Sequence, residues 1–107
     1  MTSDEAQLCG RILADLGVEV IRVEKPGGDD GRNRGPFYKN EIHPEKSLWG
    51  FFLNANKKGI TLNLDSKDGI AIFKKLVRDA DFILESSPPG YMATLGLDYQ
   101  ALASICP

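Results

Sequence analysis

The alternation of helix-type and strand-type patterns along the chain is the strongest constraint on its fold. Within residues 8–16, apolar residues recur every three or four positions, which predicts a helix with one apolar face. Thr2 and Glu5 have the spacing of a capping box at its start, and Gly17 is a typical residue for its end. Residues 18–23 are rich in β-branched side chains and follow directly, so a buried strand is expected there.

In the middle of the chain, a long loop interrupts the alternation of helix and strand patterns, which then resumes. Residues 29–46 are charged and show no convincing period, and a loop of this length in a small domain is often functional. Residues 47–53 form an apolar run that predicts a short helix capped by Ser47. Residues 60–64 alternate between apolar and polar side chains, as expected of a half-buried strand.

The last part of the chain adds a helix, a strand and a final helix. Ser66 is the expected cap of the first of these helices, whose inner face carries Ile70, Phe73, Leu76 and Val77. Residues 81–85 predict a third strand, and residues 86–90 predict a loop. Asp98 is expected to cap a last helix that runs through Ile105.

This order of elements predicts an α/β fold. Strands separated by helices favour a small, parallel, Rossmann-like sheet with right-handed crossovers, flanked by helices and containing about three strands. Ligands of such sheets gather at the carboxyl ends of the strands. The strand residues expected to be buried are Val20, Ile21, Leu62, Phe82 and Leu84.

Composition excludes several classes of function. The net charge is −2, so the chain has no overall positive field for nucleic acid or for an anionic membrane. No apolar run reaches the length of about 18 residues that a membrane span needs. The two cysteines, Cys9 and Cys106, match no metal-binding spacing and indicate reduced thiols in a cytoplasmic protein.

Few residues suggest catalysis directly. His43 is the only histidine, and its irregular polar surroundings favour solvent exposure over general base catalysis. Asp29 and Asp30 favour a solvated turn over a metal site, and no metal ligands are expected elsewhere. The pair Gly27 and Gly28 lacks the remaining glycines of a dinucleotide-binding turn.

Local positive charge is the more informative feature. Lys25, Arg32 and Arg34 follow the first strand, and Lys57 and Lys58 precede the second. If these groups converge on one edge of the sheet, they suit the phosphates of a ligand as charged hydrogen-bond donors. The alternative is a set of scattered surface lysines. The residues alone therefore favour an α/β domain and leave phosphate binding open.

A resemblance extends this prediction. Residues 13–29 (LADLGVEVIRVEKPGGD) resemble the opening "LADLGAEVIKVEPPGGD" of the CaiB/BaiF family of CoA-transferases, family III. Residues 54–64 (NANKKGITLNL) resemble the family's "NRNKRSITLDL" block, and residues 77–85 (VRDADFILE) resemble "VRDADVLVENF". A fourth match, to "PGxxxxLGLxYE", covers residues 89–99. In order, these blocks span nearly the whole chain.

The resemblance implies an acyl-CoA transferase that moves CoA between carboxylic acids through an aspartyl intermediate. An α-methylacyl-CoA racemase of the same family and a non-catalytic CoA-binding module are the alternatives. The implied partners are a coenzyme A thioester and a carboxylic acid as substrates, with a second copy of the chain in an interlocked homodimer. The residues that the resemblance implies to bind CoA are Lys25, Leu62, Ser86 and Ser87. Arg32 or Lys57 is expected to help Lys25 meet the CoA phosphates, because of the local positive charge.

The sequence also departs from the family pattern. Ser86 and Ser87 replace an Asn-Phe pair, which removes an aromatic wall of the cofactor site, and Thr94 stands where some members have an arginine. The family opens with a strand before the first helix, whereas a helical pattern here begins almost at Met1. Its catalytic aspartate lies past the position of Pro107. Residues 1–107 are therefore expected to be a partial N-terminal CoA-binding domain that shows no transfer activity by itself.

Overall fold

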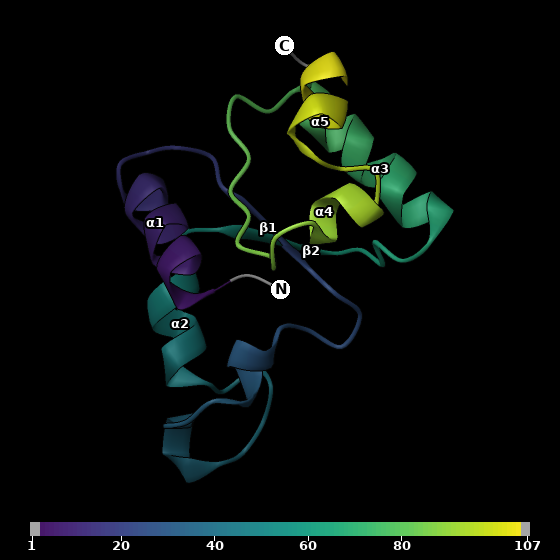
Figure 1. Cartoon of the computed structure of the whole chain (residues 1–107). Coiled ribbons are helices and arrows are strands. Elements are labelled where there is room, and N and C mark those ends of the chain that lie inside the picture. Colours follow the sequence, from purple (N-terminus) through teal and green to yellow (C-terminus); the bar gives the residue numbers. More distant parts are fainter. Residues whose placement is uncertain (1–2, 106–107) are drawn as a thin grey trace.

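The computed structural model describes residues 3–105, which form an α/β arrangement around a parallel two-stranded sheet (Figure 1). The elements in chain order are α1 (Asp4–Asp15), β1 (Ile21–Glu24), the 3-10 turns η1 (Asp30–Asn33) and η2 (Tyr38–Asn40), α2 (Leu48–Asn54), β2 (Lys58–Thr61), α3 (Lys67–Arg78), α4 (Tyr91–Thr94) and α5 (Tyr99–Ile105). In the sheet, Ile21 lies beside Lys58 and Glu24 lies beside Thr61. The expected α/β class with a parallel sheet is confirmed.

Short polar side chains start the helices, as their positions in the sequence predict. The Ser47 hydroxyl accepts a hydrogen bond from the Gly50 amide at 3.1 Å, and the Ser66 hydroxyl accepts one from the Gly69 amide at 3.0 Å. Asp98 Oδ1 accepts from the Ala101 amide at 2.9 Å at the start of α5. Thr2, the predicted cap of the first helix, lies outside the described residues. Within them, Ser3 caps α1.

Gly17 ends α1 as its position predicts. Its φ of +97° lies in the left-handed region that favours glycine. The following amide, that of Val18, donates to the Leu13 carbonyl at 3.0 Å, which satisfies one of the free carbonyls at the end of the helix. The chain therefore reverses directly from α1 into β1.

The buried apolar side chains form two small groups instead of one continuous core. Ala14 and Leu53 are buried where α1 packs on α2, while Val77 and Leu97 are buried around α3 and the α4–α5 region. Figure 1 shows these two groups of helices apart from each other, with the strands between them. The sheet therefore joins two helical layers and has little apolar cover of its own.

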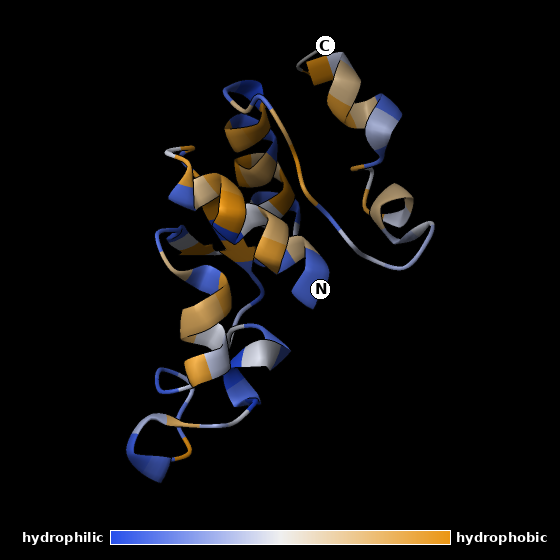
Figure 2. Ribbon diagram, turned by 90° about the vertical axis from the view of Figure 1, so that its left-hand side faces the viewer, coloured by the Kyte–Doolittle hydropathy of each residue, from blue (hydrophilic) through white to orange (hydrophobic). Residues whose placement is uncertain are grey.

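The predicted third strand is wrong. Residues 82–88 have no regular secondary structure, and the Phe82 side chain is 85% exposed. A strand requires a partner for its backbone groups. β1 pairs with β2, and within residues 3–105 no segment pairs with the other edge of β1. Figure 2 shows this apolar stretch as an irregular trace after α3.

The predicted burial of the strand residues is also wrong. Ile21 and Leu84 are exposed together with Phe82, and Val20 and Leu62 are only half-buried. The apolar pattern identifies the side chains whose burial would stabilise the fold. A side chain is buried only where another element packs over it, and a two-stranded sheet is too small to hold a covering element on each of its faces.

The second strand is displaced from its predicted position. Residues 60–64 were the expected strand, but β2 runs from Lys58 to Thr61. Asn63 instead forms the turn before α3, because its carbonyl oxygen accepts from the Ser66 hydroxyl at 2.8 Å and its side chain accepts from the Asp65 amide at 3.0 Å. The turn chemistry of Asn63 therefore ends the strand early.

The close approach at Gly69 generates a stability prediction. A Cβ atom at this position would lie 1.9 Å from the Asn63 carbonyl oxygen, so Gly69→Ala must displace the turn before α3. We expect the free energy of unfolding to fall by about 1–3 kcal/mol, as for other overpacking substitutions. Urea denaturation gives the measurement. Gly59→Ala is the matched control, because a Cβ there meets no atom within 4 Å. Equal stability of the two variants would contradict the close approach.

Candidate functional site

A buried carboxylate at the end of β1 organises the candidate site. Glu24 is 4% exposed, and both of its oxygens accept hydrogen bonds from the Arg32 guanidinium, from Nε at 2.7 Å and from Nη2 at 2.7 Å. Arg22 Nη1 lies 3.1 Å from Glu24 Oε1 and Arg22 Nη2 lies 3.0 Å from Asp29 Oδ2. We call Arg22, Glu24, Asp29 and Arg32 the Glu24 cluster.

The Glu24 cluster folds the loop after β1 back onto the strand. The Asp29 amide donates to Glu24 Oε2 at 2.9 Å. The hydrogen bonds from Arg32, together with the Asp29 amide and the charge of Arg22, lower the pKa of Glu24 to about 2, although burial acts in the opposite direction. Asp29 is itself buried, so the predicted solvated turn is wrong at this residue and holds only for exposed Asp30.

Two of the predicted CoA-binding residues meet at the carboxyl edge of the sheet. Lys25 directly follows β1, is exposed, and pairs with Asp30 through a contact of 3.0 Å. Leu62 directly follows β2, and its amide donates to the Glu24 carbonyl oxygen at 2.9 Å. Parallel pairing therefore brings both residues to the same edge.

A hollow of about 300 Å³ lies at the same edge, and we call it the edge hollow. It is lined by Ser3, Asp4, Gln7, Asp29, Asp30, Gly31, Arg34 and Ser86. The Ser86 hydroxyl accepts a hydrogen bond from the Ser3 amide at 2.5 Å, which joins the loop before α4 to the start of α1. The first turn of a helix favours negative charge, and Arg34 supplies a cation paired with Asp4. Ser87 lies next to this contact, and its amide donates to Glu85 Oε2 at 2.8 Å.

Lys57 is not brought to this edge by the backbone. It precedes β2, so in the parallel register it lies at the opposite end of the sheet from Lys25. Its ammonium group donates to the Gln7 carbonyl oxygen at 2.8 Å and to Asn54 Oδ1 at 2.9 Å. Burial lowers the pKa of Lys57 to about 8, and the charge of Arg22 adds to this effect. Lys58 pairs instead with Glu19 on the surface.

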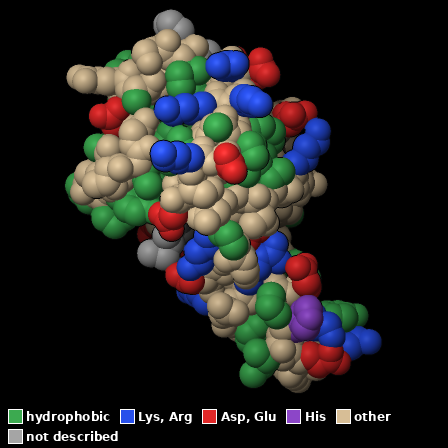
Figure 3. All heavy atoms as spheres, turned by 90° about the vertical axis from the view of Figure 1, so that its right-hand side faces the viewer, with side chains coloured by type: hydrophobic (Ala, Val, Ile, Leu, Met, Phe, Trp, Pro, Cys, Tyr) green, Lys and Arg blue, Asp and Glu red, His purple; other side chains and the backbone are tan. Residues whose placement is uncertain are grey.

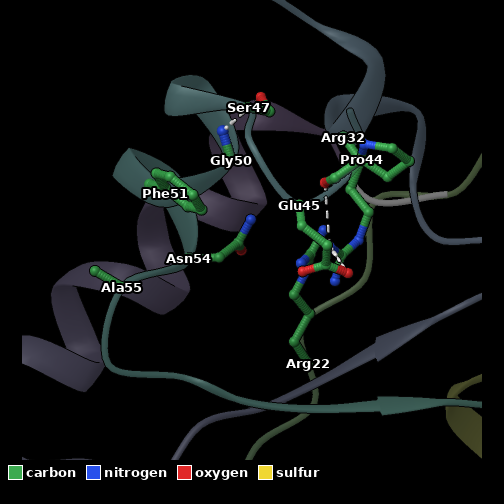
Figure 4. A pocket seen from close by; sticks show the side chains of 9 residues that line it. All are labelled: Arg22, Arg32, Pro44, Glu45, Ser47, Gly50, Phe51, Asn54 and Ala55. Carbon is green, nitrogen blue, oxygen red and sulfur yellow. Dashed lines mark hydrogen bonds and ion pairs between the residues drawn. The ribbon is translucent and has the colours of Figure 1, made fainter. Parts of the chain in front are cut away.

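A second hollow of about 380 Å³, the α2 pocket, lies between the Glu24 cluster and α2 (Figure 4). It is lined by Arg22, Arg32, Pro44, Glu45, Ser47, Gly50, Phe51, Asn54 and Ala55. The sequence predicted Arg32 as a ligand-binding residue but gave no signal for Pro44 or Glu45. Both lie in the aperiodic loop, whose path depends on contacts such as that of the Ser47 hydroxyl with the Arg34 carbonyl oxygen at 2.7 Å.

The remaining chemical candidates do not line these hollows. His43 is exposed, as predicted, in the part of the chain that protrudes at the bottom of Figure 3. Cys9 is a free, exposed thiol, and Cys106 lies outside the described residues. Within residues 3–105, no group of acidic, histidine or cysteine side chains is arranged to hold a metal ion. None of the helices in this range is long and apolar enough to cross a bilayer.

The lowered pKa of Glu24 generates a pH prediction. Its folded-state pKa lies below the ordinary value of 4.5, so its contribution to stability is complete above pH 4.5 and is lost as the pH falls toward 2. Glu24→Gln should lower the free energy of unfolding at pH 7 by about 3 kcal/mol, and the difference from the wild type should narrow below pH 4.5.

The measurement for Glu24→Gln is urea denaturation at a series of pH values. Asp30→Asn, which breaks the exposed pair with Lys25, is the control and should change stability little at any pH. A Glu24→Gln difference that stays constant between neutral and acid pH would contradict the assigned pairing.

Comparison with known proteins places this arrangement in a family. The chain is 37% identical over 103 residues to the succinyl-CoA:(R)-benzylsuccinate CoA-transferase subunit BbsE of Thauera aromatica, covering 96% of this chain and 25% of the relative. It is 43% identical over 97 residues to the acetyl-CoA:oxalate CoA-transferase of Acetobacter aceti, covering 90% of this chain and 24% of that protein. It thus spans about a quarter of the length of these relatives.

The solved structure of a CaiB/BaiF family protein from Brucella suis matches with a TM-score of 0.84 at 34% identity, over 94% of this chain and 27% of that one. The sequence pattern of CoA-transferase family III matches residues 5–107. The chain therefore belongs to CoA-transferase family III.

Proposed function

We propose that this chain forms part of the Rossmann-like CoA-binding domain of an acyl-CoA transferase. The reaction moves CoA from an acyl-CoA donor to a carboxylic acid. The support is that the similar curated proteins are named as CoA-transferases, and that this similarity extends over nearly the whole chain. The geometry contributes a parallel strand edge with a nearby helix start, an arrangement at which phosphorylated ligands commonly bind.

The observation that carries the proposal is the position of Lys25. It stands at the carboxyl end of β1, and its side chain is 57% exposed and paired with the exposed Asp30. An exposed ion pair of this kind is weak, so the ammonium group can exchange Asp30 for a ligand phosphate. Lys25 is therefore the residue assigned to the CoA phosphates.

The other expected ligand residues take different parts in this proposal. Leu62 lies beside the end of β1 and offers an apolar contact for adenine, and Ser86 and Ser87 offer polar contacts from the loop before α4. Arg32 already bonds to Glu24, and Lys57 already bonds to Gln7 and Asn54. In this proposal the two residues stabilise the protein around the site and do not contact CoA.

The chemical step of the proposed reaction uses a carboxylate nucleophile. An aspartate attacks the thioester carbonyl and forms a mixed anhydride with release of the CoA thiolate. The thiolate then attacks the aspartyl carbonyl, which gives an aspartyl thioester and releases the donor acid as its carboxylate. No described residue is assigned this role. Asp98 caps α5 through its side chain, and Asp65 and Asp81 are exposed residues of the turns on either side of α3.

The proposal also includes a cytoplasmic homodimer. Its support is the family resemblance together with exposed apolar side chains on α2, namely Leu48, Phe51 and Phe52. Sedimentation of the whole protein distinguishes a dimer from a monomer directly.

The test of the site is Lys25→Ala. Loss of a charged hydrogen bond should weaken CoA binding by about 1–3 kcal/mol, measured by calorimetry in the whole polypeptide to which these residues belong. Lys58→Ala is the matched control, because Lys58 is an exposed, ion-paired lysine at the other end of the sheet. Unchanged affinity in Lys25→Ala, or an equal loss in both variants, would remove Lys25 from the site.

A further inference from the structure

The charges beneath the α2 pocket do not balance among themselves. Arg22 pairs with Glu24 and Asp29, Arg32 pairs with Glu24, and Lys57 interacts electrostatically with both Arg22 and Asp29. Three cationic groups thus face two carboxylates, and all five are buried or partly buried. These five groups therefore carry a net charge of +1, although Lys57 itself does not line the pocket.

Glu45 neutralises this charge from the mouth of the pocket. Its Oε1 lies 3.3 Å from Arg32 Nη1, and its side chain is 73% exposed (Figure 4). The other nitrogens of the same guanidinium bond to Glu24 at 2.7 Å. Among residues 3–105, the partners of Nη1 are Glu45 and the Pro44 carbonyl oxygen, the latter also at 3.3 Å. Because both contacts are long and exposed, Nη1 keeps most of its capacity to bind a better-placed anion.

The walls of the α2 pocket are suited to an apolar group. Pro44, Phe51 and Ala55 line it beside the polar side chain of Asn54. The volume of about 380 Å³ is within the range of small-molecule sites. A planar guanidinium at the floor matches the geometry of a carboxylate.

We propose that the α2 pocket binds a small organic carboxylate with a compact apolar body, and that Glu45 is its internal placeholder. The ligand carboxylate replaces that of Glu45 on Arg32 Nη1, and the body of the ligand rests against Phe51 and Pro44. The exchange is non-covalent and leaves the charge of the site unchanged. The α2 pocket shares no lining residue with the edge hollow, and Lys25, the residue assigned to the CoA phosphates, does not line it.

The experiment titrates the ¹⁵N-labelled 107-residue chain with phenylacetate and, separately, with phenylacetamide. The two probes have the same shape, but only phenylacetate carries a charge. We expect phenylacetate to shift the amide signals of Gly50, Asn54 and Ala55 saturably in the millimolar range. Phenylacetamide should leave these signals in place, because it cannot replace the negative charge of Glu45.

The decisive variant is Glu45→Gln. Removing the competing carboxylate should tighten phenylacetate binding about two- to five-fold, as expected for loss of an exposed ion pair. Glu19→Gln is the matched control, since it removes an exposed glutamate paired with Lys58, which lies outside the pocket, and should change nothing. Phe51→Ala should weaken binding through the lost apolar contact.

Three results would each overturn the proposal: no shift of the pocket amides with phenylacetate, equal binding of phenylacetamide, or unchanged affinity in Glu45→Gln. Titrations of the whole polypeptide with CoA and with phenylacetate separate this proposal from the proposed function. Absence of CoA binding with intact phenylacetate binding contradicts the CoA site alone.

Discussion

Glu24 ends β1 with a buried carboxylate, and the path of the following loop depends on how that charge is satisfied. Burying a carboxylate costs several kcal/mol unless it is paired and hydrogen-bonded. Here the Arg32 guanidinium binds it through two nitrogens, the Asp29 amide adds a third donor, and Arg22 links Glu24 to Asp29. Together these contacts hold the first part of the loop, as far as Arg32, against the end of β1.

The loop that is anchored in this way contributes lining residues to both hollows. The loop that Glu24 holds contributes Asp29, Asp30 and Arg34 to the edge hollow and Arg32 to the α2 pocket. Lys25 lines neither hollow. It is exposed at the end of β1, and its ion-pair partner there, Asp30, is also exposed. The satisfied carboxylate of Glu24 therefore lies next to an exposed cation, Lys25, and holds the guanidinium of Arg32 at the α2 pocket.

Convergence of site residues was predictable where it follows from position along a strand. Lys25 and Leu62 each come directly after a strand, and parallel pairing brings them to one edge. The same register places Lys57 at the opposite end, although the sequence grouped it with the other cations. Glu45 was missed because residues 29–46 have no period, and a loop without a period takes its path from contacts distant in sequence.

The sequence by itself determined the local events. These are the polar caps at Ser47, Ser66 and Asp98 and the stop at Gly17, each of which depends on residues close along the chain. The order of helical and strand-like segments also indicated the α/β class. Only the tertiary structure decided which strand-like segments pair and which charges meet. Residues 82–85 carry a strand pattern but lack a partner, because backbone hydrogen bonds between strands require a neighbour that no local pattern can supply.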